Sequence, residues 1–358
     1  MTAPKIFVFS PNERASECHQ KLEDAGCRVV LGSASWHTPH GDNEDEMCRL
    51  AEASAALMGS SIRSSPISRR ILESSDSLRI VAKYTVGIDD VDVDAATELG
   101  IMVTHAPTEA NCGGVAEGTI AMILAILKKT REKDEEMKKR KWRDLALQGT
   151  YLGARKDGYP GITVGIIGLG RIGGRVAELL APWGVRILAT DPYIDKGEFA
   201  RHRAEEVDLP TLLGKSDVVS LHVILTRETR RMIGAAEFGM MKPTAVFINT
   251  SRGPTVDEAA LVEALAEDGI AAAAIDVFED EPLATDSPLL ALGNKVLLSP
   301  HMVSSNLGGG LHPGALWATR SVLTALGGEV PDNVYNKEVI GRWDERFGGQ
   351  KLLTAAAE

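Results

Sequence analysis

Three residues suited to acid–base and carbonyl chemistry follow one another in the second half of the chain. Arg252 lies in the segment NTSRG, Glu281 in DVFEDEP and His301 in SPH, each after a short apolar run. Histidine exchanges protons near neutral pH. A carboxylate beside it would favour the protonated ring and fix its tautomer. Arginine offers a planar pair of N–H donors to a carboxylate and a positive charge to a carbonyl oxygen.

These side chains suit the interconversion of a 2-hydroxy acid and its 2-keto acid. Oxidation of the hydroxy acid gives up a proton, which needs a base, and a hydride, which needs an acceptor. Taken singly, Arg252 could be a surface cation, Glu281 a turn residue and His301 an ordinary hydrogen-bonded histidine. Because parallel strands end at one edge of a sheet, we expect the three to meet at one crevice.

A glycine-rich segment, GLGRIG at residues 168–173, predicts the hydride acceptor. It follows the apolar run TVGII and opens an amphipathic stretch, as a dinucleotide loop does between a strand and a helix. Gly168 would permit the tight turn, Gly170 the approach of a pyrophosphate and Gly173 the packing of helix on strand. The helix N-terminus would offer N–H donors to the phosphates. An ordinary glycine turn and a methyltransferase loop are the alternatives.

Asp191 ends the next apolar run, roughly 20 residues after Gly168, as a ribose-binding acid should. Its carboxylate would accept hydrogen bonds from the adenosine ribose diol and repel a 2′-phosphate. No arginine directly follows it, and Lys196 is the one cation close by in sequence. The pattern therefore predicts NAD rather than NADP as the cofactor.

The elements that must position these residues form two series of strand-like runs alternating with helical stretches, which is typical of parallel α/β sheets. The first series predicts a small flavodoxin-like layer from runs at 5–9, 28–31, 55–58, 78–82 and 102–104. The second predicts a Rossmann, doubly wound sheet from runs at 162–167, 185–190, 218–221, 245–248, 271–275 and 296–298. An apolar helix at 115–127 and a highly charged helical stretch at 128–143 are expected between them.

Composition narrows the range of partners. A chain of 358 residues corresponds to about two domains. Its 39 basic and 50 acidic residues give a net charge of −11, which argues against nucleic acid or anionic membranes as partners. No leader pattern is seen, and the longest apolar run is far too short to span a bilayer. Four cysteines without a C-x-x-C pair argue against a metal or disulfide framework, so a cytoplasmic protein is expected.

The chain resembles the D-isomer-specific 2-hydroxyacid dehydrogenase family over nearly its whole length. Within that family it looks most like the D-3-phosphoglycerate dehydrogenase-like group, without the C-terminal regulatory domain that some members carry. The segments that carry the resemblance are KYTVGIDDVDVDAATELGI (83–101), VAEGTIAMIL (115–124), VGIIGLGRIG (164–173), MKPTAVFINTSRGPTVDEAALVEAL (241–265), DVFEDEP (276–282) and SPH (299–301).

The resemblance implies roles for the matching residues. His301 would be the acid–base group, Glu281 its partner and Arg252 the anchor of the substrate carboxylate and carbonyl. The backbone N–H groups of Val86 and Gly87 would also bind that carboxylate. On the cofactor side, Arg171 and Ile172 would cover the pyrophosphate, Asp276 would hold the nicotinamide carboxamide, and Val223 and Thr250 would line the cofactor.

The resemblance also implies a domain layout. A discontinuous substrate-binding domain would comprise residues 1–107 and 304–358, and an NAD-binding domain residues 108–303. A homodimer built on the cofactor domain is expected. Arg63 and Lys83 follow strand-like runs of the small domain and could bind a distal anion of the substrate, or could be ordinary strand-end cations. Tyr84 is bulkier than its usual counterpart and could narrow the substrate pocket.

Several positions depart from the family pattern. Gly118 replaces a usual histidine, Ile224 a usual proline, and Met302 and Val303 a usual small pair. Three glycines at 308–310, followed by Pro313, occupy the place of a helix-forming run. The changes around His301 bear more on the choice of substrate than on the reaction.

Other functions on the same fold remain open from the sequence. A regulator that senses NAD, like the co-repressor members of the family, could keep all three residues. A phosphite or formate dehydrogenase is a further alternative. Glu281 argues against formate, because that branch carries glutamine there and takes no proton from a hydroxyl.

Overall fold

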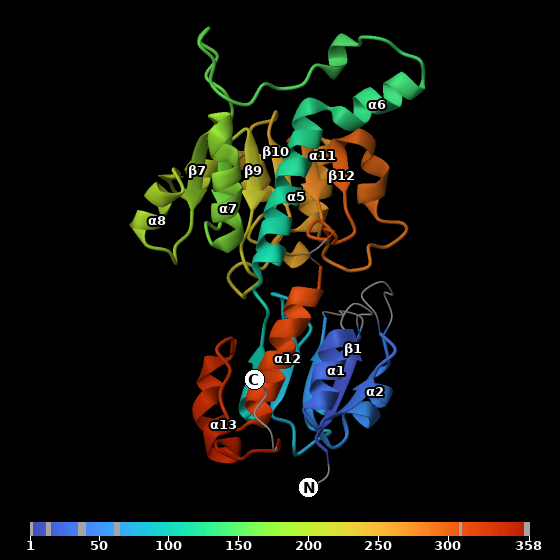
Figure 1. Cartoon of the computed structure of the whole chain (residues 1–358). Coiled ribbons are helices and arrows are strands. Elements are labelled where there is room, and N and C mark those ends of the chain that lie inside the picture. Colours follow the sequence, from blue (N-terminus) through green and yellow to red (C-terminus); the bar gives the residue numbers. More distant parts are fainter. Residues whose placement is uncertain (1–2, 12–15, 35–40, 61–64, 308–309, 354–358) are drawn as a thin grey trace. The chain divides into compact units, whose positions relative to one another are not determined.

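The computed structural model describes residues 3–11, 16–34, 41–60, 65–307 and 310–353 (Figure 1). The chain divides into two compact units. Unit 1 comprises Met1–Asn111 with Leu307–Glu358, and unit 2 comprises Cys112–Asn306. In Figure 1 unit 1 is the blue, cyan and red part, and unit 2 runs from green to orange.

Unit 1 is built on a parallel sheet with the strand order β2-β1-β3-β4-β5. This is the flavodoxin-like order, so the expected fold class is confirmed. Each strand lies within two residues of its predicted position. The strands are β1 (Lys5–Ser10), β2 (Arg28–Leu31), β3 (Ser54–Gly59), β4 (Ile80–Lys83) and β5 (Met102–Thr104).

Both faces of this sheet are covered by helices. Along β1, Ile6 and Val8 face one apolar cluster and Phe7 and Phe9 the other, as the two-residue period of a strand requires. The first cluster contains residues of α1 (Ser16–Asp24), α12 (His312–Leu326) and α13 (Ile340–Phe347). The second contains residues of α2 (Glu44–Ala51), α3 (Arg69–Leu72) and α4 (Val93–Glu98).

The C-terminal part of the chain therefore completes unit 1. Helix α12 packs with β4 and α1, and Trp343 of α13 is fully buried and donates its indole N–H to the Arg79 carbonyl. The 3₁₀ turn η6 (Lys337–Val339) precedes α13. Pro313 stands in the first turn of α12, where no intrahelical donor is needed, so this departure fits a helix after all. Of the run at 308–310, residues 308 and 309 lie outside the described residues.

Unit 2 is built on a parallel sheet with the order β12-β11-β10-β9-β6-β7-β8. The order reverses between β6 and β9, which makes this a doubly wound sheet with its switch point there. Six strands are as predicted, whereas β8 consists of two exposed glutamates and carries no apolar signal. The strands are β6 (Thr163–Ile167), β7 (Arg186–Thr190), β8 (Glu205–Glu206), β9 (Val218–Leu221), β10 (Val246–Asn249), β11 (Ala272–Ile275) and β12 (Val296–Leu298).

Two helical layers enclose this sheet. One apolar cluster takes residues from α5 (Glu109–Lys128), α7 (Arg171–Leu180) and α8 (Lys196–Arg201). The other takes residues from α9 (Leu209–Lys215), α10 (Ala235–Met240) and α11 (Glu258–Ala266). The charged stretch forms α6 (Thr130–Lys138), which ends before the expected residue 143. Short 3₁₀ turns complete the unit: η2 (Leu145–Leu147), η3 (Ala181–Trp183), η4 (Gly253–Thr255) and η5 (Pro288–Lys295).

Helix α5 is long and apolar enough, by length and composition, to cross a membrane. Its position gives a different explanation. Ala116, Met122, Ile123 and Leu127 pack in the apolar cluster against the sheet of unit 2. The helix is therefore a core helix of the Rossmann unit.

Candidate active site

The glycine-rich loop has the geometry that a dinucleotide needs. Gly168 has a φ of +89°, and a Cβ there would lie 2.8 Å from the His222 carbonyl oxygen. A Cβ on Gly173 would lie 2.0 Å from the Gly168 carbonyl oxygen, so the helix could not pack as it does. At Gly170, the N-cap of α7, a Cβ would meet no atom within 4 Å. The loop thus closes tightly on the protein side and leaves room on the other.

The first turn of α7 presents Arg171 and Ile172 beside this open space. N–H groups in the first turn of a helix have no intrahelical acceptor and carry a partial positive charge. A pyrophosphate would supply both acceptors and negative charge. The residues present therefore fit a dinucleotide at this helix.

Asp191 directly follows β7, and its side chain reaches back to the loop. Its Oδ2 accepts a hydrogen bond from the Leu169 N–H at 2.9 Å, and its Oδ1 accepts one from the Tyr193 N–H at 3.0 Å. Each carboxylate oxygen has a second acceptor position. The carboxylate can therefore hold the glycine turn and still accept from a ribose hydroxyl.

The remaining predicted cofactor residues follow β9, β10 and β11 at the same edge of the sheet. A side-chain methyl of Val223 would lie 3.2 Å from a Cβ on Gly168, so Val223 lines the glycine turn. Thr250 is buried, and its hydroxyl lies 2.9 Å from that of Thr119 on α5. Thr119 was not predicted from the sequence, where it is one small residue in an apolar helix.

The predicted pair of His301 and Glu281 is formed. Nδ1 of His301 lies 2.8 Å from Oε2 of Glu281. Oε1 of Glu281 accepts from the Phe278 N–H at 3.0 Å, which fixes the orientation of the carboxylate. Beside an ionised carboxylate, Nδ1 carries the proton. The imidazole is 35% exposed, and Nε2 is the nitrogen on the side of the ring away from Glu281.

His301 sits on a strained turn that Asp276 supports. Its φ is +55°, a left-handed conformation that costs a non-glycine residue roughly 1–2 kcal/mol. The His301 N–H donates to the Asp276 carbonyl at 2.8 Å. Oδ1 of Asp276 accepts from the N–H groups of Met302 at 2.9 Å and Val303 at 3.1 Å. The Asp276 side chain thus holds the turn that presents His301. From the sequence, Asp276 was expected only to hold the nicotinamide carboxamide.

Burial raises the pKa of Asp276, and hydrogen bonds from the Ser299 side chain and from the two amides oppose that shift. The carboxyl group is almost fully buried, so its ionised form depends on these donors. A second titratable group lies near the glycine loop. Burial lowers the pKa of His222 to about 4, so this ring is neutral near pH 7. Its Nε2 lies 2.8 Å from the Ser220 hydroxyl.

Arg252 lies on a turn packed directly against that of Glu281. A Cβ on Gly253 would lie 1.7 Å from the Phe278 carbonyl oxygen, so only glycine allows the two turns to touch. The Arg252 carbonyl accepts from the Thr255 hydroxyl at 2.6 Å, and its guanidinium donates to the Ser251 carbonyl at 2.7 Å. The three predicted catalytic residues therefore stand on turns that are fixed to one another through backbone contacts.

Two departures from the family pattern meet in this site. A Cβ on Gly118 of α5 would lie 2.2 Å from Cγ2 of Val303 and 2.5 Å from its carbonyl oxygen. The missing side chain at residue 118 makes room for the larger residue at 303. Helix α5 therefore packs against the turn that carries His301. In the sequence, the changes at residues 118 and 303 looked unrelated.

The predicted carboxylate loop belongs to unit 1. It follows β4 and contains Val86 and Gly87, both partly exposed. The Thr85 hydroxyl donates to the Gly87 carbonyl at 2.7 Å, and the Thr85 carbonyl accepts from the Ala106 N–H at 2.8 Å. Within the described part of the chain, no acceptor is found for the Val86 N–H. A bound carboxylate could accept from it.

The expectation for Lys83 is corrected by the structure. Its side chain is fully buried, and Nζ donates to the two Asp90 carboxylate oxygens at 2.8 and 2.6 Å and to the Ser60 carbonyl at 2.8 Å. Burial lowers the pKa of Lys83, and the neighbouring Asp90 opposes that shift. Its charge is thus directed into the protein, and it does not face a distal anion of the substrate.

Tyr84 is also placed differently from the expectation. Its ring is buried in the apolar cluster beneath α12, so it does not narrow a pocket. Arg63, the other candidate for a distal anion, lies outside the described residues. Across the described segments, no group of three or more His, Cys, Asp or Glu side chains is arranged to hold a metal ion.

Comparison with known proteins agrees with this geometry. Residues 120–303, about half of the chain, match the NAD-binding domain of the D-isomer specific 2-hydroxyacid dehydrogenases. A glyoxylate reductase from Thermofilum pendens is 37% identical over 355 residues, which cover 95% of this chain and 96% of that protein. The chain belongs to the D-isomer-specific 2-hydroxyacid dehydrogenase family. It is an NAD(P)-dependent D-2-hydroxyacid dehydrogenase, as its site and fold predict.

Two further relatives of this dehydrogenase bear on its place in the family. The solved structure of an NADPH-dependent glyoxylate/hydroxypyruvate reductase from Sinorhizobium meliloti, with NADP and malonate, has a TM-score of 0.75 and 28% identity. It covers 94% of this chain and 98% of that one. A D-3-phosphoglycerate dehydrogenase from Archaeoglobus fulgidus is 36% identical over 80% of this chain, but the match spans only 52% of that protein.

Proposed function

We propose that this dehydrogenase is a glyoxylate reductase, which reduces glyoxylate and similarly small 2-keto acids with NADH. The observation that carries the proposal is the contact of 2.8 Å between His301 and Glu281 at the edge that holds the dinucleotide loop. The burial of Lys83 on Asp90 supports a substrate without a distal phosphate. Relatives named glyoxylate reductase match over most of their own length, which favours them over the phosphoglycerate dehydrogenase-like group.

In the proposed reaction, the glycine-rich loop and Asp191 would hold NADH, and the cofactor, when bound, would supply the hydride that reduces the carbonyl carbon. His301 supplies the proton to the carbonyl oxygen through Nε2 and becomes neutral. Glu281 stabilises the protonated ring before the transfer and holds it in one orientation. Arg252 binds the substrate carboxylate and draws charge from the carbonyl oxygen. In unit 1, the proposed role of the Val86 and Gly87 N–H groups is to bind the same carboxylate.

We propose NADH rather than NADPH as the preferred cofactor because Asp191 directly follows β7. A carboxylate already held by the Leu169 and Tyr193 amides cannot turn away from a 2′-phosphate without losing both bonds. We expect kcat/KM with NADH to exceed that with NADPH by at least about tenfold. Equal values for the two cofactors would refute this preference.

The test of the proposed function is turnover by the purified protein. Oxidation of NADH should be measured with glyoxylate, hydroxypyruvate and phosphohydroxypyruvate, and reduction of NAD with formate and phosphite. We expect glyoxylate and hydroxypyruvate to be reduced and phosphohydroxypyruvate to be the poorest keto acid. NADH binding without any turnover would favour the NAD-sensing regulator, and turnover of phosphite alone would favour that branch.

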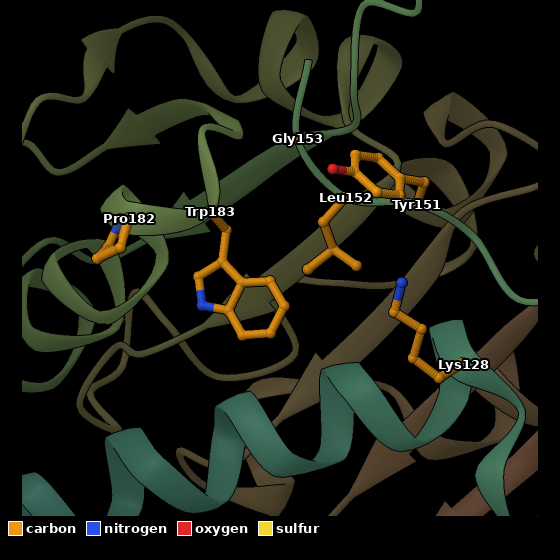
Figure 2. A pocket seen from close by; sticks show the side chains of 6 residues that line it. All are labelled: Lys128, Tyr151, Leu152, Gly153, Pro182 and Trp183. Atoms are coloured by element: carbon orange, nitrogen blue, oxygen red, sulfur yellow. The ribbon is translucent and has the colours of Figure 1, made fainter. Parts of the chain in front are cut away.

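We also propose a cytoplasmic homodimer formed through unit 2. The exposed large apolar side chains of this unit include Trp142, Leu145, Tyr151 and Trp183. Tyr151 and Trp183 border a hollow of about 370 Å³, whose lining is completed by Lys128, Leu152, Gly153 and Pro182 (Figure 2). Trp142 lies on the segment that projects beyond α6 in Figure 1 and would supply an apolar group to a second copy.

The oligomeric state tests this part of the proposal. We expect sedimentation to give a dimer for the native protein and a monomer, or a weakened dimer, for Trp142→Ser. Leu31→Ser, at an exposed apolar position of unit 1, is the control and should leave the dimer intact. A native protein that sediments as a monomer would contradict the proposed assembly.

A further inference from the structure

A buried polar cluster at the carboxyl edge of the unit 1 sheet has no role in the chemistry described above. Lys83 at the end of β4 is fully buried, and Asp90 is almost so. Nζ of Lys83 also binds the Ser60 carbonyl just after β3, and the Ser60 hydroxyl lies 2.5 Å from that of Ser10 at the end of β1. The ends of three neighbouring strands are thus joined through one ammonium group, which also lies over the ring of Phe9.

This ion pair closes a loop. Lys83 and Asp90 are the residues on either side of residues 84–89, and the loop between them contains Val86 and Gly87. Within the loop, the Thr85 hydroxyl donates to the Gly87 carbonyl at 2.7 Å, and the Thr85 carbonyl accepts from the Ala106 N–H at 2.8 Å. The Tyr84 N–H donates to the Gly59 carbonyl at 2.9 Å at its start, and the Asp90 carbonyl accepts from the Ile67 N–H at 2.7 Å after its end. The separation of Lys83 and Asp90 therefore sets the span that the loop must cross.

Stability alone is a poor explanation for such a pair. Taking two charges out of water is expensive, and apolar residues of similar volume commonly serve as well or better. A buried ion pair does specify geometry, because its charged hydrogen bonds are short and directional. Here both Asp90 oxygens accept from the same ammonium group, which fixes the carboxylate as well as the chain that follows it.

We propose that the Lys83–Asp90 pair is a positioning device that holds the amide groups of Val86 and Gly87 in place for the substrate carboxylate. The inference rests on the proposed function of that loop. Lys83 would act on the substrate indirectly, by positioning the backbone of the loop, and would not contact the substrate itself. Loss of the pair should weaken binding of the keto acid far more than it slows the chemical step, because the proton donor lies on another unit.

The same strand carries a matched control at its other end. Arg79 directly precedes β4 and is also buried, but its guanidinium donates to the Ala325 and Gln350 carbonyls and lies over the Phe347 ring. These partners belong to the C-terminal part of unit 1. Arg79→Met should therefore disturb the stability of the same unit without acting on the loop at residues 84–89.

The test replaces both charges at once, so that no unpaired charge is left inside the protein. The double variant Lys83→Met/Asp90→Leu is compared with Arg79→Met and the native enzyme by thermal unfolding, by steady-state kinetics with glyoxylate and NADH, and by amide hydrogen exchange. We expect the double variant to fold and to show a KM for glyoxylate raised by about tenfold or more, with kcat and the KM for NADH changed much less. Arg79→Met should leave the KM for glyoxylate unchanged.

Hydrogen exchange separates this inference from the proposed function. Exchange at the amides of residues 84–89 should be faster in the double variant than in the native protein, whether or not glyoxylate is the substrate. If the native protein does not reduce keto acids but exchange in this loop is still faster in the double variant, the proposed function fails, and the positioning role of the Lys83–Asp90 pair stands. A folded double variant with native exchange in the loop and a native KM would overturn the inference.

Discussion

The two parallel sheets present different kinds of group at their carboxyl edges. In unit 2 the strand ends present reactive side chains, such as the partly exposed His301, while buried carboxyl groups hold the backbone behind them. In unit 1 the arrangement is reversed, because the charged side chains Lys83 and Asp90 are buried and the backbone of the loop is partly exposed. The comparison indicates that proton transfer needs a mobile charge on a side chain, whereas recognition of a carboxylate can be left to fixed amides.

The largest effect should come from removing the proton donor at the unit 2 edge. His301→Asn suits this test because asparagine tolerates the left-handed backbone found there. We expect kcat for keto-acid reduction to fall by about 10²- to 10⁴-fold, with NADH affinity unchanged in a fluorescence titration. His312→Asn, on α12 of unit 1, is the control and should keep native activity. Full activity in His301→Asn would remove this residue from the mechanism.

The next largest effect tests whether helix α5 positions the catalytic turn. In Gly118→Ala the new methyl group would overlap Val303, so the turn carrying His301 must shift. A displacement of about 1 Å can cost roughly 100-fold in rate, so we expect a large fall in kcat. Gly113→Ala on the same helix is the matched control, because a Cβ there meets no atom within 4 Å. Similar activity in the two variants would show that the contact at residue 118 does not position His301.

A smaller effect, on stability, is expected when Asp276, the buried carboxyl group of unit 2, is replaced. Because burial raises the pKa of Asp276 above its ordinary value, ionising it costs folding free energy at neutral pH, and that cost is relieved as pH falls through the raised pKa. We expect Asp276→Asn to unfold at the native temperature or higher near pH 7, with lower activity. Its advantage over the native protein should shrink as the pH is lowered, because the native carboxyl group then takes up its proton. A variant that is less stable at neutral pH, by a margin that does not change with pH, would contradict this assignment.

Much of the fold follows from local patterns in the sequence. Apart from β8, the strands of both sheets are short apolar runs bounded by polar segments, and the glycine loop, Glu281 and His301 follow such runs within a few residues. Each signal is contained in a few neighbouring residues, which is why positions and roles could be predicted together. Strand β8 was not predicted, because its two residues are exposed glutamates without an apolar pattern.

The features that escaped prediction depend on contacts between distant residues. A lysine after a strand looks the same in sequence whether it faces solvent or a buried carboxylate, so the sequence leaves Lys83 as either a ligand of a distal anion or an ordinary strand-end cation, and its partner Asp90 appears only in the structure. Gly118 and Val303 are far apart in the chain, and their contact appears only when α5 packs beside the turn after β12. The hydrogen bonds by which the Asp276 side chain holds the His301 turn could not be predicted either, because they also join residues that are distant in the chain.

The central claim, that Glu281 and His301 act as one proton-transfer unit, is tested most directly by the pH dependence of kcat/KM for glyoxylate in the native enzyme and in Glu281→Gln. Reduction needs the protonated ring, and the Glu281 carboxylate at 2.8 Å stabilises that form. Without the carboxylate the ring loses the partner that orients Nε2 and stabilises its charged form, so kcat/KM for glyoxylate should fall and its pH profile should change, with the same protein fold and NADH affinity. An identical pH profile in the two enzymes would contradict the account.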